Sequence, residues 1–114
     1  MPSAEWQPRW RTGDTDQMLR HVALFRWNPS TTSDVIDAAT AGLAGLPPAI
    51  PEIAVYRFGS DAGINDGNFD FAVVADFESR GDYLAYRDHP AHQAVLAERI
   101  APHVSDRAAV QYEY

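Results

Sequence analysis

The chain contains no cysteine, no lysine and no long apolar run in its 114 residues. Without cysteine it can have no disulfide framework, no thiolate metal site and no cysteine nucleophile, and it suits a reducing compartment. Nine arginines against sixteen acidic residues give a formal net charge of −7, so it lacks the basic stripe that binds nucleic acid or an anionic membrane. No stretch approaches the ~20 apolar residues of a membrane span, and the N-terminal segment lacks a signal-peptide core. We therefore expect a cytoplasmic protein with neither of those partners.

Length and composition predict one globular domain with an N-terminal arm. Hydrophobic residues make up 46% of the chain, enough for an ordinary core. Residues 1–17 are polar and show no periodicity, apart from Trp6 and Trp10. These two side chains could fasten the arm to the body or to a second subunit, or the arm could be a loose tail. We expect the folded domain over residues 18–114.

Within that domain, strand and helix patterns alternate. Residues 18–27 are predicted to form a strand in which His21 and Phe25 share one face and Val22 and Leu24 the other. The other predicted elements are a helix from Thr31 or Thr32 to Pro47-Pro48, strands over 53–59, 69–78 and 107–114, and a helix from Ser79 toward Arg87.

This order predicts an α+β fold: a ferredoxin-like βαββαβ sandwich, with a four-stranded antiparallel sheet and helices on one face. The other face would be bare, with Val22 and Leu24 on the first strand and Ala72 and Val74 on the third. Because an exposed apolar patch usually binds a partner, we expect a homodimer formed through the sheet faces.

Most residues suited to chemistry lie between Tyr83 and His103. Pro90 should end one helix near Asp88 and begin another. In a continuous helix Tyr86 and His92 would lie ~240° apart, whereas a break between them would let both face one pocket.

Two interpretations of His92 remain open. Its face also carries Leu96 and Ile100, and a histidine on an apolar stripe is more often a packed residue bonded to a backbone carbonyl. The alternative is a cavity shared with His21 from the first strand. Two imidazoles and the Tyr86 phenol would support proton transfer next to a carbonyl group. In that case the expected pocket-lining residues are Phe25, Phe71, Val73 and Leu96.

Metal and cofactor sites are not expected. His89 and His92 form an H-x-x-H pair, but Pro90 interrupts it and zinc requires three or four ligands. His103 is expected to lie near a helix end, where an imidazolium suits the helix dipole. Glycine-rich phosphate loops, nucleophile elbows and H-E-x-x-H motifs do not occur in the sequence.

Four segments resemble the Dabb family of stress-responsive dimeric α/β-barrel proteins: HVALFRW, the helix ending before Pro47-Pro48, FAVVADFES, and YRDHPAHQ. The resemblance covers residues 18–114. It implies ferredoxin-like protomers whose sheets pair into a dimeric α/β barrel. One plant enzyme of this family cyclises a polyketide by aldol condensation without a metal. Its catalytic histidine corresponds to His92, its tyrosine to Tyr86 and a first-strand histidine to His21.

Three hypotheses about function follow. The first is a stress-responsive Dabb homodimer without an assigned biochemical role. The second is a metal-independent, cofactor-free cyclase or aldolase-like enzyme in which His92 is the base, Tyr86 orients it or the substrate carbonyl, and His21 assists. The third is a carrier of a small apolar ligand.

Overall fold

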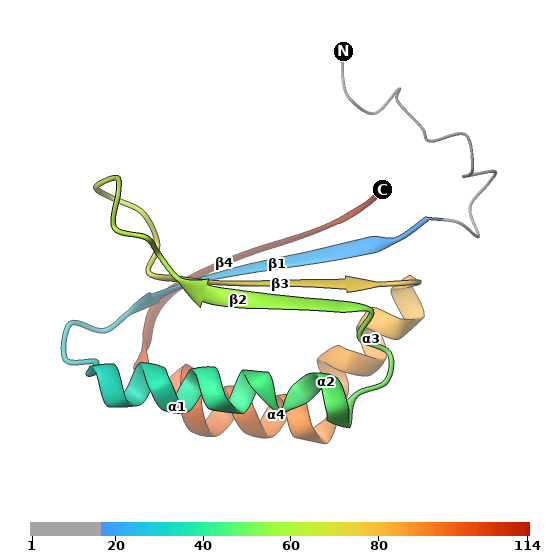
Figure 1. Ribbon diagram of the computed structural model, residues 1–114, viewed down its shortest axis with the longest axis horizontal. Helices are drawn as coiled ribbons and strands as arrows, with labels where there is room; N and C mark the ends of the chain where they lie inside the picture. The colour runs from blue at the N-terminus through green and yellow to red at the C-terminus, as the bar shows by residue number, and fades with distance from the viewer. Residues whose placement is uncertain (1–16) are drawn as a thin grey trace, which may run out of the picture.

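The computed structural model describes residues 17–114, so residues 1–16 of the predicted arm, including Trp6 and Trp10, lie outside the described residues. The elements in chain order are β1 (Leu19–Trp27), α1 (Ser33–Ala44), α2 (Leu46–Ala49), β2 (Val55–Ser60), β3 (Phe71–Phe77), α3 (Arg80–Asp88), α4 (Pro90–Val95), a π-helical turn (Leu96–Ile100), a 3-10 turn (Ala101–His103) and β4 (Val104–Glu113). Figure 1 shows the helices gathered in one layer beneath the sheet.

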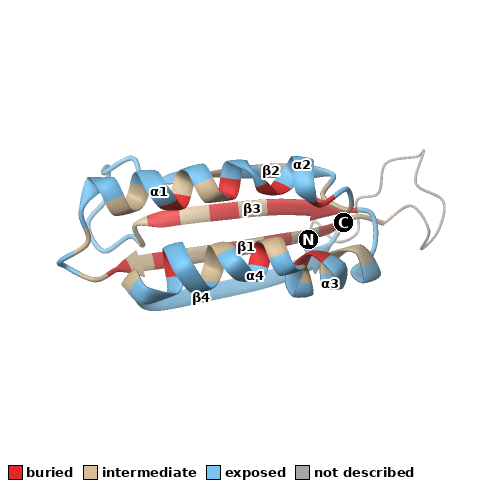
Figure 2. Cartoon of the chain, turned by 90° about the horizontal axis from the view of Figure 1, so that it is seen from below, coloured by how far each residue is buried: buried red, intermediate tan, exposed pale blue. Residues whose placement is uncertain are grey.

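The sheet has the order β2-β3-β1-β4, and every neighbouring pair is antiparallel. Seen from the helical side, α1 and α4 lie side by side beneath the sheet, and buried residues alternate along β3 (Figure 2). This architecture confirms the predicted ferredoxin-like fold. Three strands begin at least two residues away from the prediction: β2 at Val55 rather than residue 53, β3 at Phe71 rather than residue 69, and β4 at Val104 rather than residue 107.

Proline positions explain the helix boundaries. The hydroxyl of Thr32 accepts a hydrogen bond from the backbone of Val35 and caps α1, which ends at Ala44. Pro47-Pro48 was expected to end helical structure, yet the chain forms one further turn, α2. Proline is tolerated in a first helical turn because its missing N–H would have no intrahelical partner there.

A glycine sets the spacing between the two long helical segments. A Cβ on Gly42 in α1 would lie 3.0 Å from Arg99 Cδ and 3.1 Å from Val95 Cγ1. Such distances would force the neighbouring side chains to shift. Gly42 therefore lets α1 pack closely against α4 and the turn that follows it.

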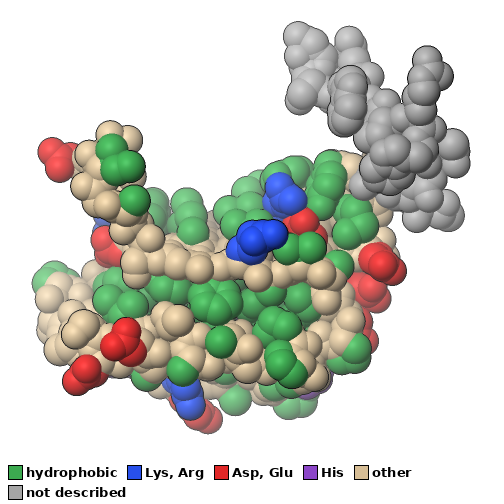
Figure 3. Space-filling view, viewed as in Figure 1, with side chains coloured by type: hydrophobic (Ala, Val, Ile, Leu, Met, Phe, Trp, Pro, Cys, Tyr) green, Lys and Arg blue, Asp and Glu red, His purple; other side chains and the backbone are tan. Residues whose placement is uncertain are grey.

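The sheet face without helices is partly apolar. Val22 pairs with Val74 on one side and with Val110 on the other, so three valines form a row across β3, β1 and β4. Val110 is 54% exposed. Hydrophobic side chains stand on this upper side of the sheet as well as between the two layers (Figure 3). We call this surface, with Leu24 and Ala72, the outer valine face.

Candidate functional site

A cavity of about 410 Å³ lies between the sheet and the helical layer. Helices α1, α3 and α4, the π-helical turn and strands β1, β3 and β4 contribute to its lining. The lining residues are His21, Ala23, Phe25, Leu43, Val73, Tyr83, Tyr86, Arg87, His92, Gln93, Leu96, Ile100, Arg107, Ala109 and Gln111. Six of the seven residues expected at the site are in this set. Phe71 is not: it is 2% exposed and packs against Trp27, with ring centroids 5.7 Å apart.

A break between two helices brings Tyr86 and His92 together, as the sequence predicted. The Ser79 hydroxyl caps α3, and α3 ends at Asp88. His89 then adopts an extended conformation, and its Nδ1 accepts a hydrogen bond of 3.0 Å from the backbone N–H of Ala91. Pro90 occupies the first turn of α4. The chain therefore turns a corner, and the two side chains point into the same cavity.

Backbone geometry fixes the tautomer of His92. Its Nδ1 lies 3.0 Å from the carbonyl oxygen of Arg87. A carbonyl oxygen can only accept, so Nδ1 carries the hydrogen and Nε2 keeps its lone pair. Burial is the main cause that lowers the pKa of His92, and the charge of Arg107 acts in the same direction, against backbone hydrogen bonds that raise it. The ring is thus held neutral, with an acceptor nitrogen on the side away from Arg87.

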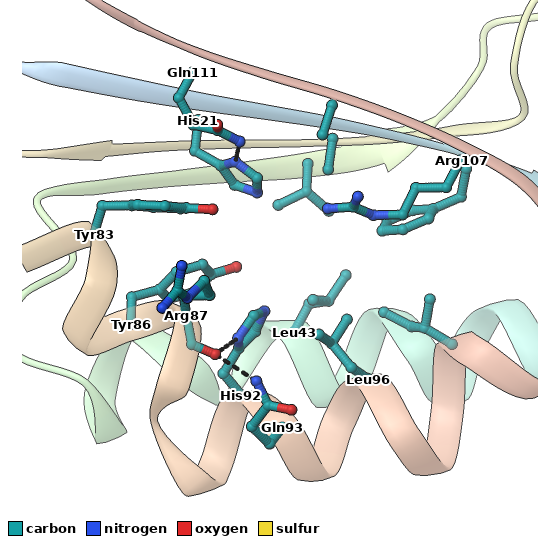
Figure 4. A pocket seen from close by; sticks show the side chains of 15 residues that line it. His21, Leu43, Tyr83, Tyr86, Arg87, His92, Gln93, Leu96, Arg107 and Gln111 are labelled. Atoms are coloured by element: carbon teal, nitrogen blue, oxygen red, sulfur yellow. Dashed lines mark hydrogen bonds between the residues drawn. The ribbon is translucent and has the colours of Figure 1, made fainter. Parts of the chain in front are cut away.

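His21 has the complementary arrangement. It is only 5% exposed, and its Nδ1 lies 2.8 Å from Nε2 of Gln111, its cross-strand neighbour on β4. An amide nitrogen donates, so the hydrogen of this neutral imidazole is on Nε2. Burial, followed by the charges of Arg107 and His92, lowers the pKa of His21 to about 4. Figure 4 shows the two imidazoles extending toward one another, His21 from the sheet and His92 from α4. The cavity therefore holds one donor and one acceptor nitrogen.

Tyr86 supports His92 through its ring. The two rings stack with centroids 4.1 Å apart and an interplanar angle of 28°. The Tyr86 hydroxyl lies 2.8 Å from the hydroxyl of Tyr56 on β2. Burial raises the pKa of Tyr86 well above its ordinary value, and the neighbouring Tyr56 adds to the increase. Tyr86 is therefore a neutral phenol that holds the imidazole plane.

Sequence reasoning missed five polar residues of the cavity: Tyr83, Arg87, Gln93, Arg107 and Gln111. Tyr83 packs beside His21, with ring centroids 5.1 Å apart, and its hydroxyl points into the cavity (Figure 4). Arg107 and Gln111 occupy alternate positions of β4, opposite Phe25 and His21 respectively. Period-two alternation along 107–111 places them on one face, but only the β1–β4 register shows that this face is the one above the cavity.

The H-x-x-H pair has separate structural roles. His89 caps α4, whereas His92 bonds to the Arg87 carbonyl. Within residues 17–114 no group of three or more histidine, aspartate or glutamate side chains could hold a metal ion. His103 lies in the 3-10 turn just before β4, where its carbonyl oxygen accepts a hydrogen bond from the Asn28 backbone. In the same part of the chain, no helix is long and apolar enough to cross a membrane.

The chain matches one protein family, and many solved structures have a similar fold. The family described as the stress responsive A/B barrel domain, Dabb, matches residues 19–114. No curated protein matches the chain. A dimeric ferredoxin-like protein of unknown function from Thermobifida fusca is 46% identical, with a TM-score of 0.81 over 91% of this chain and 97% of that one.

Two more distant structures have the same fold. A dimeric ferredoxin-like protein of unknown function from Bacteroides fragilis is 25% identical, with a TM-score of 0.74 over 85% of this chain and 96% of that one. A hydroxynitrile lyase from Passiflora edulis is 21% identical, with a TM-score of 0.76 over 87% of this chain and 94% of that one. Similar proteins thus include dimers without an assigned role and one named enzyme.

Proposed function

The chain belongs to the family of stress responsive A/B barrel domains, and we propose that it is a homodimer whose cavity binds a small carbonyl compound and transfers a proton beside the carbonyl group. The observation that carries this proposal is an open space of about 410 Å³ bordered by two neutral imidazoles of opposite hydrogen-bonding character. A packed, purely structural histidine would leave no such space beside its second nitrogen.

His92 is the proposed base. Its lowered pKa keeps it unprotonated at neutral pH, and its Nε2 lone pair can accept a proton from a carbon next to a carbonyl group. The resulting imidazolium would be stabilised by the hydrogen bond from Nδ1 to the Arg87 carbonyl oxygen. The stacked ring of Tyr86 holds the imidazole in position, so Tyr86 acts as a positioning residue.

His21 and Tyr83 are the proposed donors to the substrate oxygen. When the proton leaves carbon, the electron pair moves toward the carbonyl oxygen, which becomes negatively charged. The Nε2–H of His21 and the Tyr83 hydroxyl both face the cavity and can donate to that oxygen. This chemistry uses side chains alone and requires no metal or cofactor. The proposal that this fold carries an enzyme is supported by the hydroxynitrile lyase from Passiflora edulis, which has the same fold.

Dimerisation through the outer valine face is the second part of the proposal. Similar proteins are dimeric, and the row of Val22, Val74 and Val110 lies on the side of the sheet away from the helices. A dimer formed there would cover apolar surface and leave the cavity open on the opposite face. The proposed location is the cytoplasm, which suits a chain without cysteine.

Deuterium exchange tests the catalytic part without knowledge of the natural substrate. Acetophenone and 3-benzoylpropionate are incubated with the protein in D₂O, and loss of the proton signal next to the carbonyl group is followed by NMR. We expect exchange faster than in buffer alone and a fall of about a hundredfold or more in His92→Gln, as for removal of a general base. His103→Gln is the matched control, because His103 does not line the cavity.

The outcomes separate an enzyme from a binding protein. If neither ketone exchanges faster than in buffer, or if His92→Gln exchanges as fast as the unchanged protein, the catalytic proposal is rejected. If both ketones bind in the cavity without exchange, the carrier hypothesis replaces it.

A further inference from the structure

Arg107 is the one cavity-lining cation without a partner in the described part of the chain. It lies on β4, and in Figure 4 its guanidinium extends beneath the sheet toward His21. Neither a hydrogen bond nor an ion pair engages this guanidinium within residues 17–114. The other arginine of the lining, Arg87, bonds to both carboxylate oxygens of Asp88 at 2.9 and 3.1 Å.

The charge of the cavity is opposite to that of the whole protein. The chain carries a formal net charge of −7, yet the lining contains two arginines, two histidines and no aspartate or glutamate. The neighbours that face Arg107 across the cavity are the neutral imidazoles of His21 and His92. Arg107 is exposed at the mouth of the cavity, and a carboxylate is the best-matched partner for a guanidinium without a counter-charge.

We propose that Arg107 makes this cavity selective for an anionic carbonyl compound, a keto acid whose carboxylate binds the guanidinium while its carbonyl group lies between His21 and His92. This inference rests on the proposed function for the position of the carbonyl group, and it adds the substrate class. Arg107 is on the inner face of β4, opposite Phe25. A dimer through the outer valine face would therefore leave it available to ligand.

A bound carboxylate would also strengthen the base. The charge of Arg107 contributes to the lowered pKa of both His21 and His92. An anion paired with Arg107 cancels part of that field, so the affinity of His92 for a proton rises when substrate is bound. An ester or amide of the same shape would give no such effect.

Binding of a matched pair of probes tests the inference. 3-Benzoylpropionate and its methyl ester differ by one negative charge, and each is titrated into ¹⁵N-labelled protein while amide and arginine Nε signals are followed by NMR. We expect the acid to bind about tenfold more tightly than the ester, because the ion pair is only partly desolvated. Arg107→Gln should remove the preference, and Arg107→Lys should keep part of it.

Arg99→Gln is the control for the change in net charge. Arg99 donates to the Ala38 carbonyl oxygen at 2.9 Å and does not line the cavity, so this variant should retain the full preference. Equal binding of acid and ester, an undiminished preference in Arg107→Gln, or no binding of either probe at millimolar concentration would overturn the inference. Because acetophenone carries no charge, its exchange can persist when the Arg107 inference fails, which distinguishes the two failures.

Discussion

Burial of a neutral His21 makes the protein sensitive to mild acid. The pKa of His21 falls from its ordinary value of 6.5 to about 4 in the folded protein, chiefly because burial disfavours the charged form. Between these two values the unfolded chain binds a proton that the folded chain does not. Stability is therefore complete above pH 6.5 and decreases as the pH falls toward 4. At 1.36 kcal/mol per pH unit, the loss from this one residue is about 3 kcal/mol.

Urea unfolding measured from neutral pH down to about pH 4 tests this value. Protein concentration must be held constant, because the stability of a dimer depends on it. We expect the free energy of unfolding to decrease by at least about 3 kcal/mol in the unchanged protein. His21→Gln should remove most of this decrease while it keeps a partner for Gln111. A smaller slope should remain, since the pKa of His92 is lowered as well.

Two other titratable residues, His103 and Asp76, serve as comparisons for His21. His103→Gln is the control for loss of an imidazole elsewhere in the protein, because the ring of His103 lies outside the cavity. The pKa of Asp76 is lowered from 3.8 by its hydrogen bond with Arg20, so its contribution is lost only at pH values below this window. Parallel curves for the unchanged protein and His21→Gln would refute the reasoning.

Two further variants test the dimer and the role of Tyr86. Val110→Asp puts a charge at the exposed end of the valine row, on the edge strand β4, and light scattering should show a monomer in place of a dimer. Ile64→Asp, in a loop at 82% exposure, is the control and should remain dimeric. A dimeric Val110→Asp would contradict the assignment of this face. Tyr86→Phe removes the hydroxyl bonded to Tyr56 but keeps the ring stacked on His92, so it should lower the free energy of unfolding by about 1 kcal/mol and leave the His92 ring ¹⁵N shifts unchanged. Tyr86→Ala removes the ring and should lower the free energy of unfolding by about 3–5 kcal/mol. It should also change the ¹⁵N shifts of the His92 ring. Equal His92 shifts in the two variants would rule out positioning by stacking.

Local patterns in the sequence were sufficient to predict the fold and six of the fifteen residues that line the cavity. Strict alternation along β1 and β3 gave the two sheet faces, and the His89-Pro90 pair gave the corner between α3 and α4, because proline geometry is a local property. The helix-facing side of β1 then placed His21 over the same corner. None of these steps required knowledge of contacts between distant strands.

The remaining site residues depend on register and packing. Gln111 contacts His21 only because β4 pairs with β1 in one particular alignment, and Arg107 reaches the cavity for the same reason. Tyr56 reaches Tyr86 from the far edge strand, through a contact that no periodicity indicates. Phe71 shares its face with Val73, but it lies nearer the Trp27 end of the sheet, so its ring fills the core instead of lining the cavity.

The pairing of β4 with β1 links the two proposed surfaces of the protein. A shift of one residue would turn Arg107 and Gln111 to the outer face and bring Val110 over the cavity, since successive side chains point to opposite sides. The correct register therefore supplies a charged, hydrogen-bonding wall for the cavity and an apolar row for the proposed dimer at the same time. Dimerisation that stabilises β4 in this register would also hold Arg107 and Gln111 in place. A monomeric variant should for this reason bind 3-benzoylpropionate less tightly than the dimer, although its cavity residues are unchanged.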